Sequence, residues 1–235
     1  MNLTLATPLL LWVAGSLGAG AVARALAARL AVLSNSGLGR WVTELALLLY
    51  YVGWPALALF SGALSADLIG LGRIGVIDAG LWLGFAPRDW LRQATTAGLA
   101  TGFVLTLAWL AGRSASAQTL GDGCAEAPLG LDWRDALYAE VHWAFYRAPF
   151  LLLLGDVYWG ALAGLALILA EWRWLGWPRF GRHPAGQFAH LGCALISTLL
   201  CISASNVWLA VIAQFAIRRY GARLIASARA GMHSR

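Results

Sequence analysis

The sequence predicts an all-α membrane protein, a bundle of about seven transmembrane helices with six to eight as the range. Three observations predict this class. Of the 235 residues, 60% are hydrophobic and only 12% are charged, whereas a soluble domain carries about 25% charged residues. The chain has 13 Trp residues, and Trp favours membrane interfaces. Long apolar runs recur along the chain, so the composition excludes a disordered chain, a coiled coil and an ordinary water-soluble globule.

Seven apolar runs approach the length of about 20 residues that a membrane-crossing helix needs. The first covers residues 3–23 and continues as a basic helical extension to residue 33. The others cover residues 41–64, 91–112, 136–154, 157–172, 187–203 and 206–217. The last three runs are the shortest, and their ends are the least sharply defined by the pattern.

Two connecting segments divide the chain. A Gly-rich stretch follows the second run as far as Asp89, and the only long hydrophilic loop covers residues 113–131. We therefore predict N-terminal transmembrane helices with their loops over residues 1–131, and a C-terminal helical core over residues 132–221. A basic tail covers residues 222–235.

The basic residues predict an orientation rather than a nucleic-acid surface. All 17 are Arg, and the formal net charge is +6. Most fall after the first run, after the fifth run and in the C-terminal segment, and these three places are on one side of the membrane if the spans alternate. The residues are Arg24, Arg29, Arg40, Arg173, Arg179, Arg182, Arg218, Arg219, Arg223, Arg229 and Arg235. By the positive-inside rule this side is cytoplasmic. We expect a bacterial inner-membrane protein with its N-terminus outside, in contact with anionic lipids.

Polar side chains within predicted spans are costly and mark candidate functional sites. The set is Glu44, Glu140, His142, Arg147, His190 and Gln214, with Asn206 at a helix entry. In the predicted orientation, Glu44, Glu140, His190 and Gln214 each lie about one turn from the inner end of their helix. Four polar groups from four helices are therefore expected at one level.

Three of these residues share the span over residues 136–154. Glu140 and Arg147 are seven residues apart, so they share a helix face but are two turns apart, a separation that predicts no tight ion pair. His142 points to the opposite side and is expected to stack under Tyr146. Pro149 is expected to kink the helix and to free nearby backbone carbonyls.

The pairing of Glu140 with His190 allows three interpretations. The carboxylate can take a proton from a water molecule while the imidazole positions that water or stabilises an oxyanion. The same two groups can ligate a metal. They can also belong to a hydrogen-bonded network that only fixes helix register. The residues themselves identify no particular metal or cofactor.

Three blocks carry a family resemblance. Residues 140–149 read Glu-Val-His-Trp-Ala-Phe-Tyr-Arg-Ala-Pro, residues 188–192 read Phe-Ala-His-Leu-Gly, and residues 206–216 read Asn-Val-Trp-Leu-Ala-Val-Ile-Ala-Gln-Phe-Ala. In this order, the blocks resemble the CPBP family of intramembrane proteases, the CAAX-protease and bacteriocin-processing group also called ABI. The resemblance covers about residues 132–218.

The resemblance implies family positions for six residues. Glu140 resembles the family's water-activating Glu, Arg147 the Arg of its Glu-Glu-x-x-x-Arg block, and His190 its first catalytic His. If the spacing to Arg147 is held fixed, His142 occupies the first Glu position instead. Gln214 stands where the family has its second His, and Arg218 where it has an Asn, so this would be a divergent member.

Two functions follow as hypotheses. The first is a glutamate- or metal-dependent intramembrane endopeptidase that cuts a membrane-anchored peptide near the cytoplasmic face. The replacement of the family's second His by Gln214 is the change that argues against hydrolysis. The second is a non-catalytic integral subunit of a larger photosynthetic or respiratory membrane complex. In that case His142 or His190 could bind a pigment or haem.

Overall fold

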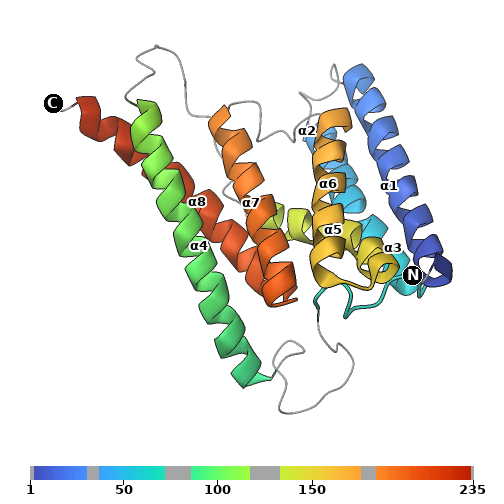
Figure 1. Cartoon of the computed structure of the whole chain (residues 1–235). Helices are drawn as coiled ribbons and strands as arrows, with labels where there is room; N and C mark the ends of the chain where they lie inside the picture. Colours follow the sequence, from blue (N-terminus) through green and yellow to red (C-terminus); the bar gives the residue numbers. More distant parts are fainter. Residues whose placement is uncertain (1–2, 31–36, 72–85, 117–132, 176–183, 234–235) are drawn as a thin grey trace. The chain divides into compact units, whose positions relative to one another are not determined.

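A computed structural model gives the fold of residues 3–30, 37–71, 86–116, 133–175 and 184–233, and these residues are helical or form turns, without a β-strand (Figure 1). The helices are α1 (Leu3–Leu30), α2 (Gly37–Leu48), a π-helical segment η2 (Leu49–Gly53), α3 (Trp54–Phe60), α4 (Pro87–Ser116), α5 (Trp133–Leu154), α6 (Val157–Leu175), α7 (Pro184–Ser203) and α8 (Val207–His233). Segments α2, η2 and α3 follow one another without a break. Most of the predicted hydrophilic loop, from residue 117 on, lies outside the described residues.

The predicted all-α class is confirmed for the described residues, and each of the seven predicted runs falls largely within a helix. The largest difference is at the C-terminal end, where α8 continues to His233 instead of ending near Ile217. The added residues are rich in Ala and Arg, which favour helix whether or not they are apolar. The predicted division of the chain at residues 131 and 221 stays a prediction.

The described residues group into two compact units, and the first comprises residues 1–75 and 138–176. In this unit α1 packs against α6, η2 and α3 (Figure 1). Helices α5 and α6 are joined by a very short turn. Gly155 adopts a positive φ of 63°, a conformation that costs Gly little. Asp156 then caps α6, because its Oδ1 accepts hydrogen bonds from the backbone N–H groups of Tyr158 and Trp159 at 2.8 and 2.9 Å.

Two glycines of α6 allow α5 to approach it closely. A Cβ atom on Gly160 would lie 2.8 Å from the Cα of Leu151, and one on Gly164 would lie 2.8 Å from the Cα of Arg147. Only residues without a side chain permit such a contact between helix backbones. The spacing of these glycines therefore determines which part of α5 faces α6.

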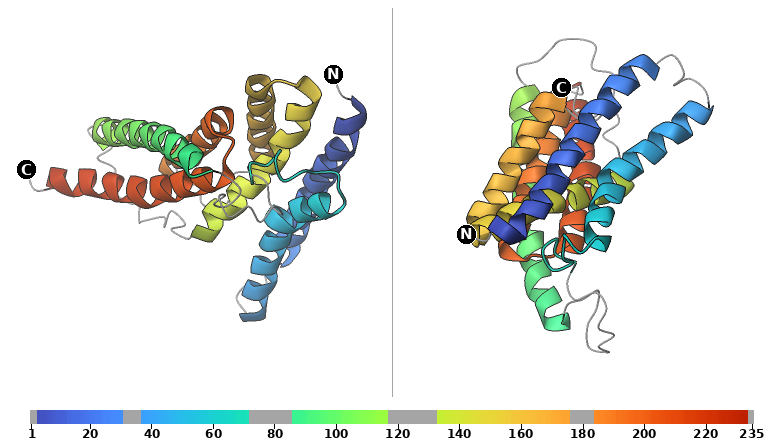
Figure 2. Two further views of the ribbon diagram at one scale, coloured as in Figure 1. Left: turned by 90° about the horizontal axis from the view of Figure 1, so that it is seen from below. Right: turned by 90° about the vertical axis from the view of Figure 1, so that its right-hand side faces the viewer.

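The second unit comprises residues 76–137 and 177–235, and its helix α4 lies along α8 while α7 packs against both (Figure 2). Asn206 forms the corner between α7 and α8. Its Oδ1 accepts hydrogen bonds from the N–H groups of Trp208 and Leu209 at 3.1 and 3.4 Å, so it caps α8. Its Nδ2 donates to Oε1 of Gln93 on α4 at 2.9 Å. The Asn206 side chain thus links the start of α8 to α4.

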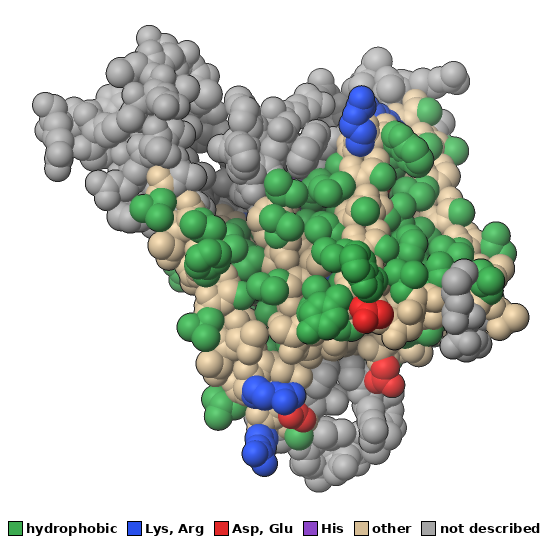
Figure 3. Space-filling model, viewed as in Figure 1, with side chains coloured by type: hydrophobic (Ala, Val, Ile, Leu, Met, Phe, Trp, Pro, Cys, Tyr) green, Lys and Arg blue, Asp and Glu red, His purple; other side chains and the backbone are tan. Residues whose placement is uncertain are grey.

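Apolar side chains cover much of the surface. On the face shown in Figure 3 they spread over the described helices, and the coloured charges lie near helix ends. Two helical segments, Ala6–Ala25 and Trp41–Phe60, are long and apolar enough to cross a membrane, and only 28% and 11% of their residues are buried. The core helix of a soluble protein would be mostly buried instead. The predicted count of seven spans is not established by these two segments.

Candidate functional site

Glu140 and Arg147 form a tight ion pair on α5. The Arg147 Nη2 atom donates to Oε1 of Glu140 at 2.6 Å, and each residue is only 2% exposed. The prediction that two helical turns separate these groups too widely for a tight pair was wrong. Side chains on an α-helix point back toward its N-terminus, so the long Arg147 side chain runs along the helix toward Glu140 and spans the distance.

The ion pair is held in place by α6. A Cβ atom on Gly164 would collide with the Cγ atom of Arg147 and would lie 3.0 Å from its Cβ atom. The stem of Arg147 therefore lies directly on the α6 backbone. Because a buried charge is costly unless it is paired, the Arg147 guanidinium and the Glu140 carboxylate stabilise each other in this position.

A second buried polar group surrounds His142. Its Nε2 lies 3.2 Å from Oε1 of Glu171 on α6. The same carboxylate oxygen accepts a hydrogen bond from the hydroxyl of Tyr50 at 2.5 Å. The Tyr50 hydroxyl in turn lies 3.4 Å from the hydroxyl of Tyr146. Residues from η2, α5 and α6 thus form one continuous polar chain inside the first unit.

Aromatic rings enclose the His142 imidazole, which is fully buried. The ring centroids of Tyr146, Tyr50 and Tyr51 lie 4.2, 4.9 and 5.0 Å from its own. His142 therefore contacts Tyr146 as predicted, but the two rings are tilted by 46° and do not stack in parallel. The Nδ1 atom of His142 is buried and has no hydrogen-bond partner among the described residues.

The backbone of the first unit is adapted to this polar chain. Tyr50 and Tyr51 belong to the π-helical segment η2, and such segments occur often at functional sites. Gly20 on α1 faces the Tyr50 side chain, because a Cβ atom there would lie 2.8 Å from the Tyr50 hydroxyl oxygen. The absence of a side chain at residue 20 therefore makes room for the phenol.

Sequence reasoning missed Glu171, Tyr50 and Tyr146 as members of this group. Glu171 follows an apolar run and precedes Arg173, a pattern typical of a solvated helix end. A usable signal was nevertheless present, because Gly160, Gly164, Ile168 and Glu171 recur every three or four residues and are all buried. That spacing puts Glu171 on the helix face that packs against α5.

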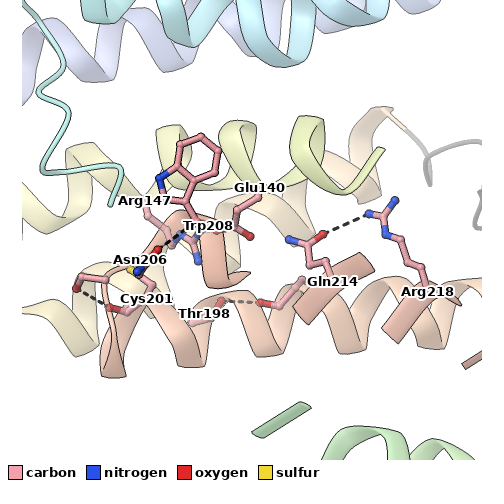
Figure 4. A network of polar contacts seen from close by, with 10 residues as sticks. Glu140, Arg147, Thr198, Cys201, Asn206, Trp208, Gln214 and Arg218 are labelled. Carbon is pink, nitrogen blue, oxygen red and sulfur yellow. Dashed lines mark hydrogen bonds and ion pairs between the residues drawn. The ribbon is translucent and has the colours of Figure 1, made fainter. Parts of the chain in front are cut away.

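The second unit holds the other predicted residues. His190 on α7 is buried, and so are Gln214 and Arg218 on α8. Arg218 donates from Nη2 to Oε1 of Gln214 at 3.4 Å (Figure 4). The charge of Arg218 also acts on the His190 imidazole.

The structure brings together some of the predicted residues. Glu140 pairs with Arg147, and His142 pairs with the unpredicted Glu171. Glu44 is exposed on α2. Glu140 belongs to the first unit, whereas His190 belongs to the second, and their predicted position at one membrane level stays a prediction.

Comparison of the chain with protein-family models, with curated proteins and with solved structures found no match. Within the described residues, no three His, Cys, Asp or Glu side chains come together as a group that could hold a metal ion. The function is therefore argued from the buried polar contacts and from the three sequence blocks.

Proposed function

We propose that this chain is a divergent, CPBP-type integral membrane protein in which Glu140 is the water-activating carboxylate. The observation that carries the proposal is the 2.6 Å contact between Glu140 and Arg147, the two charged residues of the block that resembles the family. Both are buried in one helix, where charged residues are rare and usually functional. Their pairing holds the Glu140 carboxylate at a fixed place in an apolar environment.

The membrane location is supported by the two long apolar segments and by their low burial within the protein. Large side chains such as Trp41 and Phe60 are 78% and 85% exposed, and lipid is the solvent that suits them. We propose about seven spans in the bacterial inner membrane, with the N-terminus outside and the Arg-rich end cytoplasmic. The basis for this orientation is the distribution of Arg residues along the sequence.

The chemistry proposed for Glu140 is general base catalysis. The carboxylate takes a proton from water, and the resulting hydroxide attacks a peptide carbonyl carbon. The same proton then passes to the leaving amine as the C–N bond breaks. Arg147 is a positioning residue, since its guanidinium holds the carboxylate in one orientation. The roles of His190 and Gln214 in handling the oxyanion rest on the sequence resemblance.

Reconstitution with a membrane-anchored peptide tests this proposal. The purified chain is placed in phospholipid vesicles with the peptide, and products are measured by mass spectrometry. We expect cleavage by the wild type, and a loss of at least about 100-fold in Glu140→Gln, the lower range for removal of a general base. Glu44→Gln is the matched control, because Glu44 is exposed. Equal activity of Glu140→Gln and wild type, or no cleavage by the wild type, would refute the proposal.

A second candidate function is a non-catalytic subunit of a larger membrane complex. It is favoured by the way the polar groups of the block are engaged: the Glu140 carboxylate binds Arg147, and the Gln214 amide oxygen binds Arg218. Groups that bind one another in this way stabilise helix packing. The exposed apolar surface then serves contacts with other subunits.

Purification from native membranes distinguishes the two candidates. A subunit would copurify with a stable partner, and a pigment- or haem-binding subunit would also show a visible absorption band. An isolated chain that cleaves peptide would support the first candidate. An isolated colourless chain without a partner would contradict the second.

A further inference from the structure

Arg218 is a buried cation that forms no ion pair with an anion of the described residues. It lies on α8 in the second unit and is 4% exposed. Its one hydrogen bond among the described residues is the 3.4 Å contact from Nη2 to the amide oxygen of Gln214 (Figure 4). Its Nε atom is buried and has no hydrogen-bond partner in the same part of the chain. None of the ion pairs among the described residues involves Arg218.

The comparison with Arg147 shows what this site lacks. Arg147 is equally buried, but a carboxylate oxygen lies 2.6 Å from its guanidinium. Gln214 offers Arg218 only a neutral amide dipole. The charge of Arg218 also acts on His190 of α7. An imidazole is either neutral or positively charged, so His190 supplies no negative charge to the site. A buried guanidinium whose partners among the described residues are neutral is energetically costly, so the site favours an anionic ligand.

The chemistry and place of Arg218 indicate which anion. A guanidinium presents its donors in a planar fork that suits the oxygens of a phosphate group. Arg218 follows the apolar part of α8 directly, and Arg219 comes next. In a membrane-embedded α8 this transition from apolar to basic residues lies at the level of the lipid headgroups. Phosphate is the anion present there on nearly every lipid.

We propose that Arg218 binds a phosphate oxyanion, that of a phospholipid headgroup at the inner membrane face, through its buried Nε and its Nη atoms. The choice of lipid rests on the proposed membrane embedding of the chain but not on peptide hydrolysis. Gln214 orients the guanidinium through the contact with its amide oxygen. Exposed arginines such as Arg24 and Arg173, by contrast, attract lipids only through screened surface charge.

The test measures ligand binding by the delipidated full chain in detergent. Short-chain phosphatidylglycerol is titrated while the thermal unfolding midpoint is followed, and native mass spectrometry counts bound lipids. Diacylglycerol of the same chain length is the control ligand without phosphate. We expect a saturable rise of the midpoint and one retained lipid with phosphatidylglycerol, and neither with diacylglycerol.

Two variants with the same charge change locate the site. Arg218→Gln is expected to weaken phosphatidylglycerol binding by at least about tenfold, because charge-assisted hydrogen bonds are lost. Arg219→Gln is the matched control. Arg219 is the neighbouring, less buried residue, with its guanidinium 5.9 Å from the Phe215 ring centroid. We expect this variant to bind within about twofold of the wild type, since it loses a partly exposed charge that solvent already screens.

A third variant keeps the test decisive if Arg218→Gln does not fold. Gln214→Glu puts a carboxylate four residues before Arg218, a spacing that favours an ion pair within a helix. This internal anion should raise the unfolding midpoint without lipid and abolish the further rise with phosphatidylglycerol. A lipid response that persists in Gln214→Glu would contradict the proposal.

The remaining outcomes separate the source of the phosphate. If inorganic phosphate raises the midpoint as strongly as the lipid at equal concentration, the oxyanion site is supported and its ligand is free phosphate. If the wild type responds saturably to neither, or if Arg218→Gln and Arg219→Gln behave alike, the proposal is wrong. A chain that binds phosphate but cuts no peptide would refute only the hydrolytic function.

Discussion

Replacement of Arg147 by Met tests whether the buried ion pair stabilises the α5–α6 packing. The Met side chain can fill much of the space along the α6 backbone that the Arg stem occupies, but Glu140 then remains buried without a cation. Removal of one partner of a buried pair costs about 3–5 kcal/mol in the free energy of unfolding. Glu140→Gln should cost a similar amount, because it leaves Arg147 without its anion.

The attraction between the two charges gives a second magnitude. Charge centres about 4 Å apart interact by about 4 kcal/mol at an effective dielectric constant of about 20. The double variant Glu140→Gln/Arg147→Met contains neither charge. It should therefore be more stable than either single variant, and the coupling free energy in the mutant cycle should be about 2–4 kcal/mol.

Unfolding in mixed detergent micelles, followed by Trp fluorescence, measures these differences. Arg92→Met is the matched control, since Arg92 contacts Asp89 at 3.7 Å but its side chain is 77% exposed. The control should change stability little, because exposed pairs contribute little. If Arg147→Met costs less than about 1 kcal/mol, or if the two single costs simply add, the ion pair does not stabilise the packing as argued.

The remaining predictions use the same unfolding measurement. Gly164→Ala should destabilise the protein by about 1–3 kcal/mol, because the added methyl group meets the α5 backbone. Gly18→Ala is the control, since a Cβ atom there meets nothing within 4 Å, and it should be neutral or stabilising by up to about 1 kcal/mol. Equal effects of the two changes would contradict the close approach of α5 and α6. Tyr50→Phe removes the hydroxyl that donates to Glu171 and should cost about 1.5–3 kcal/mol; an unchanged stability would mean that this hydrogen bond is not needed. Asp156→Ala removes the cap of α6 and should cost about 1 kcal/mol, while Asp156→Asn should recover most of it; a similar loss in both variants would argue against capping.

The helices could be predicted from the sequence because their signal is local. An apolar run of sufficient length is helical whether it faces lipid or protein, since its backbone groups must bond to one another. The end of α8 could not be placed in this way, because the helix continues to His233 through basic residues after the apolar run stops. Hydropathy reports where a helix can contact lipid and not where its hydrogen bonding ends.

The polar contacts were harder to predict because they depend on side-chain direction and on packing between helices. The seven-residue separation of Glu140 and Arg147 placed both on one face, but only the reach of the Arg side chain toward the N-terminus closes the gap. Tyr50 lies in a π-helical segment, and no residue pattern in the sequence indicated that segment. Its contact with Glu171 connects positions 121 residues apart, and such pairing arises from tertiary packing.

The buried charges of this chain follow one physical rule, and the departure from it locates the proposed ligand. With only 12% charged residues, each buried charge needs a specific partner, because few other charges are near. Glu140 has Arg147, and Glu171 has His142. Among the described residues, Arg218 has an amide oxygen as its partner instead of an anion. The other buried charges of the described residues are closely paired, so a negatively charged ligand would complete the Arg218 site. In the proposed membrane embedding, the nearest such group at the end of the apolar part of α8 is a lipid phosphate.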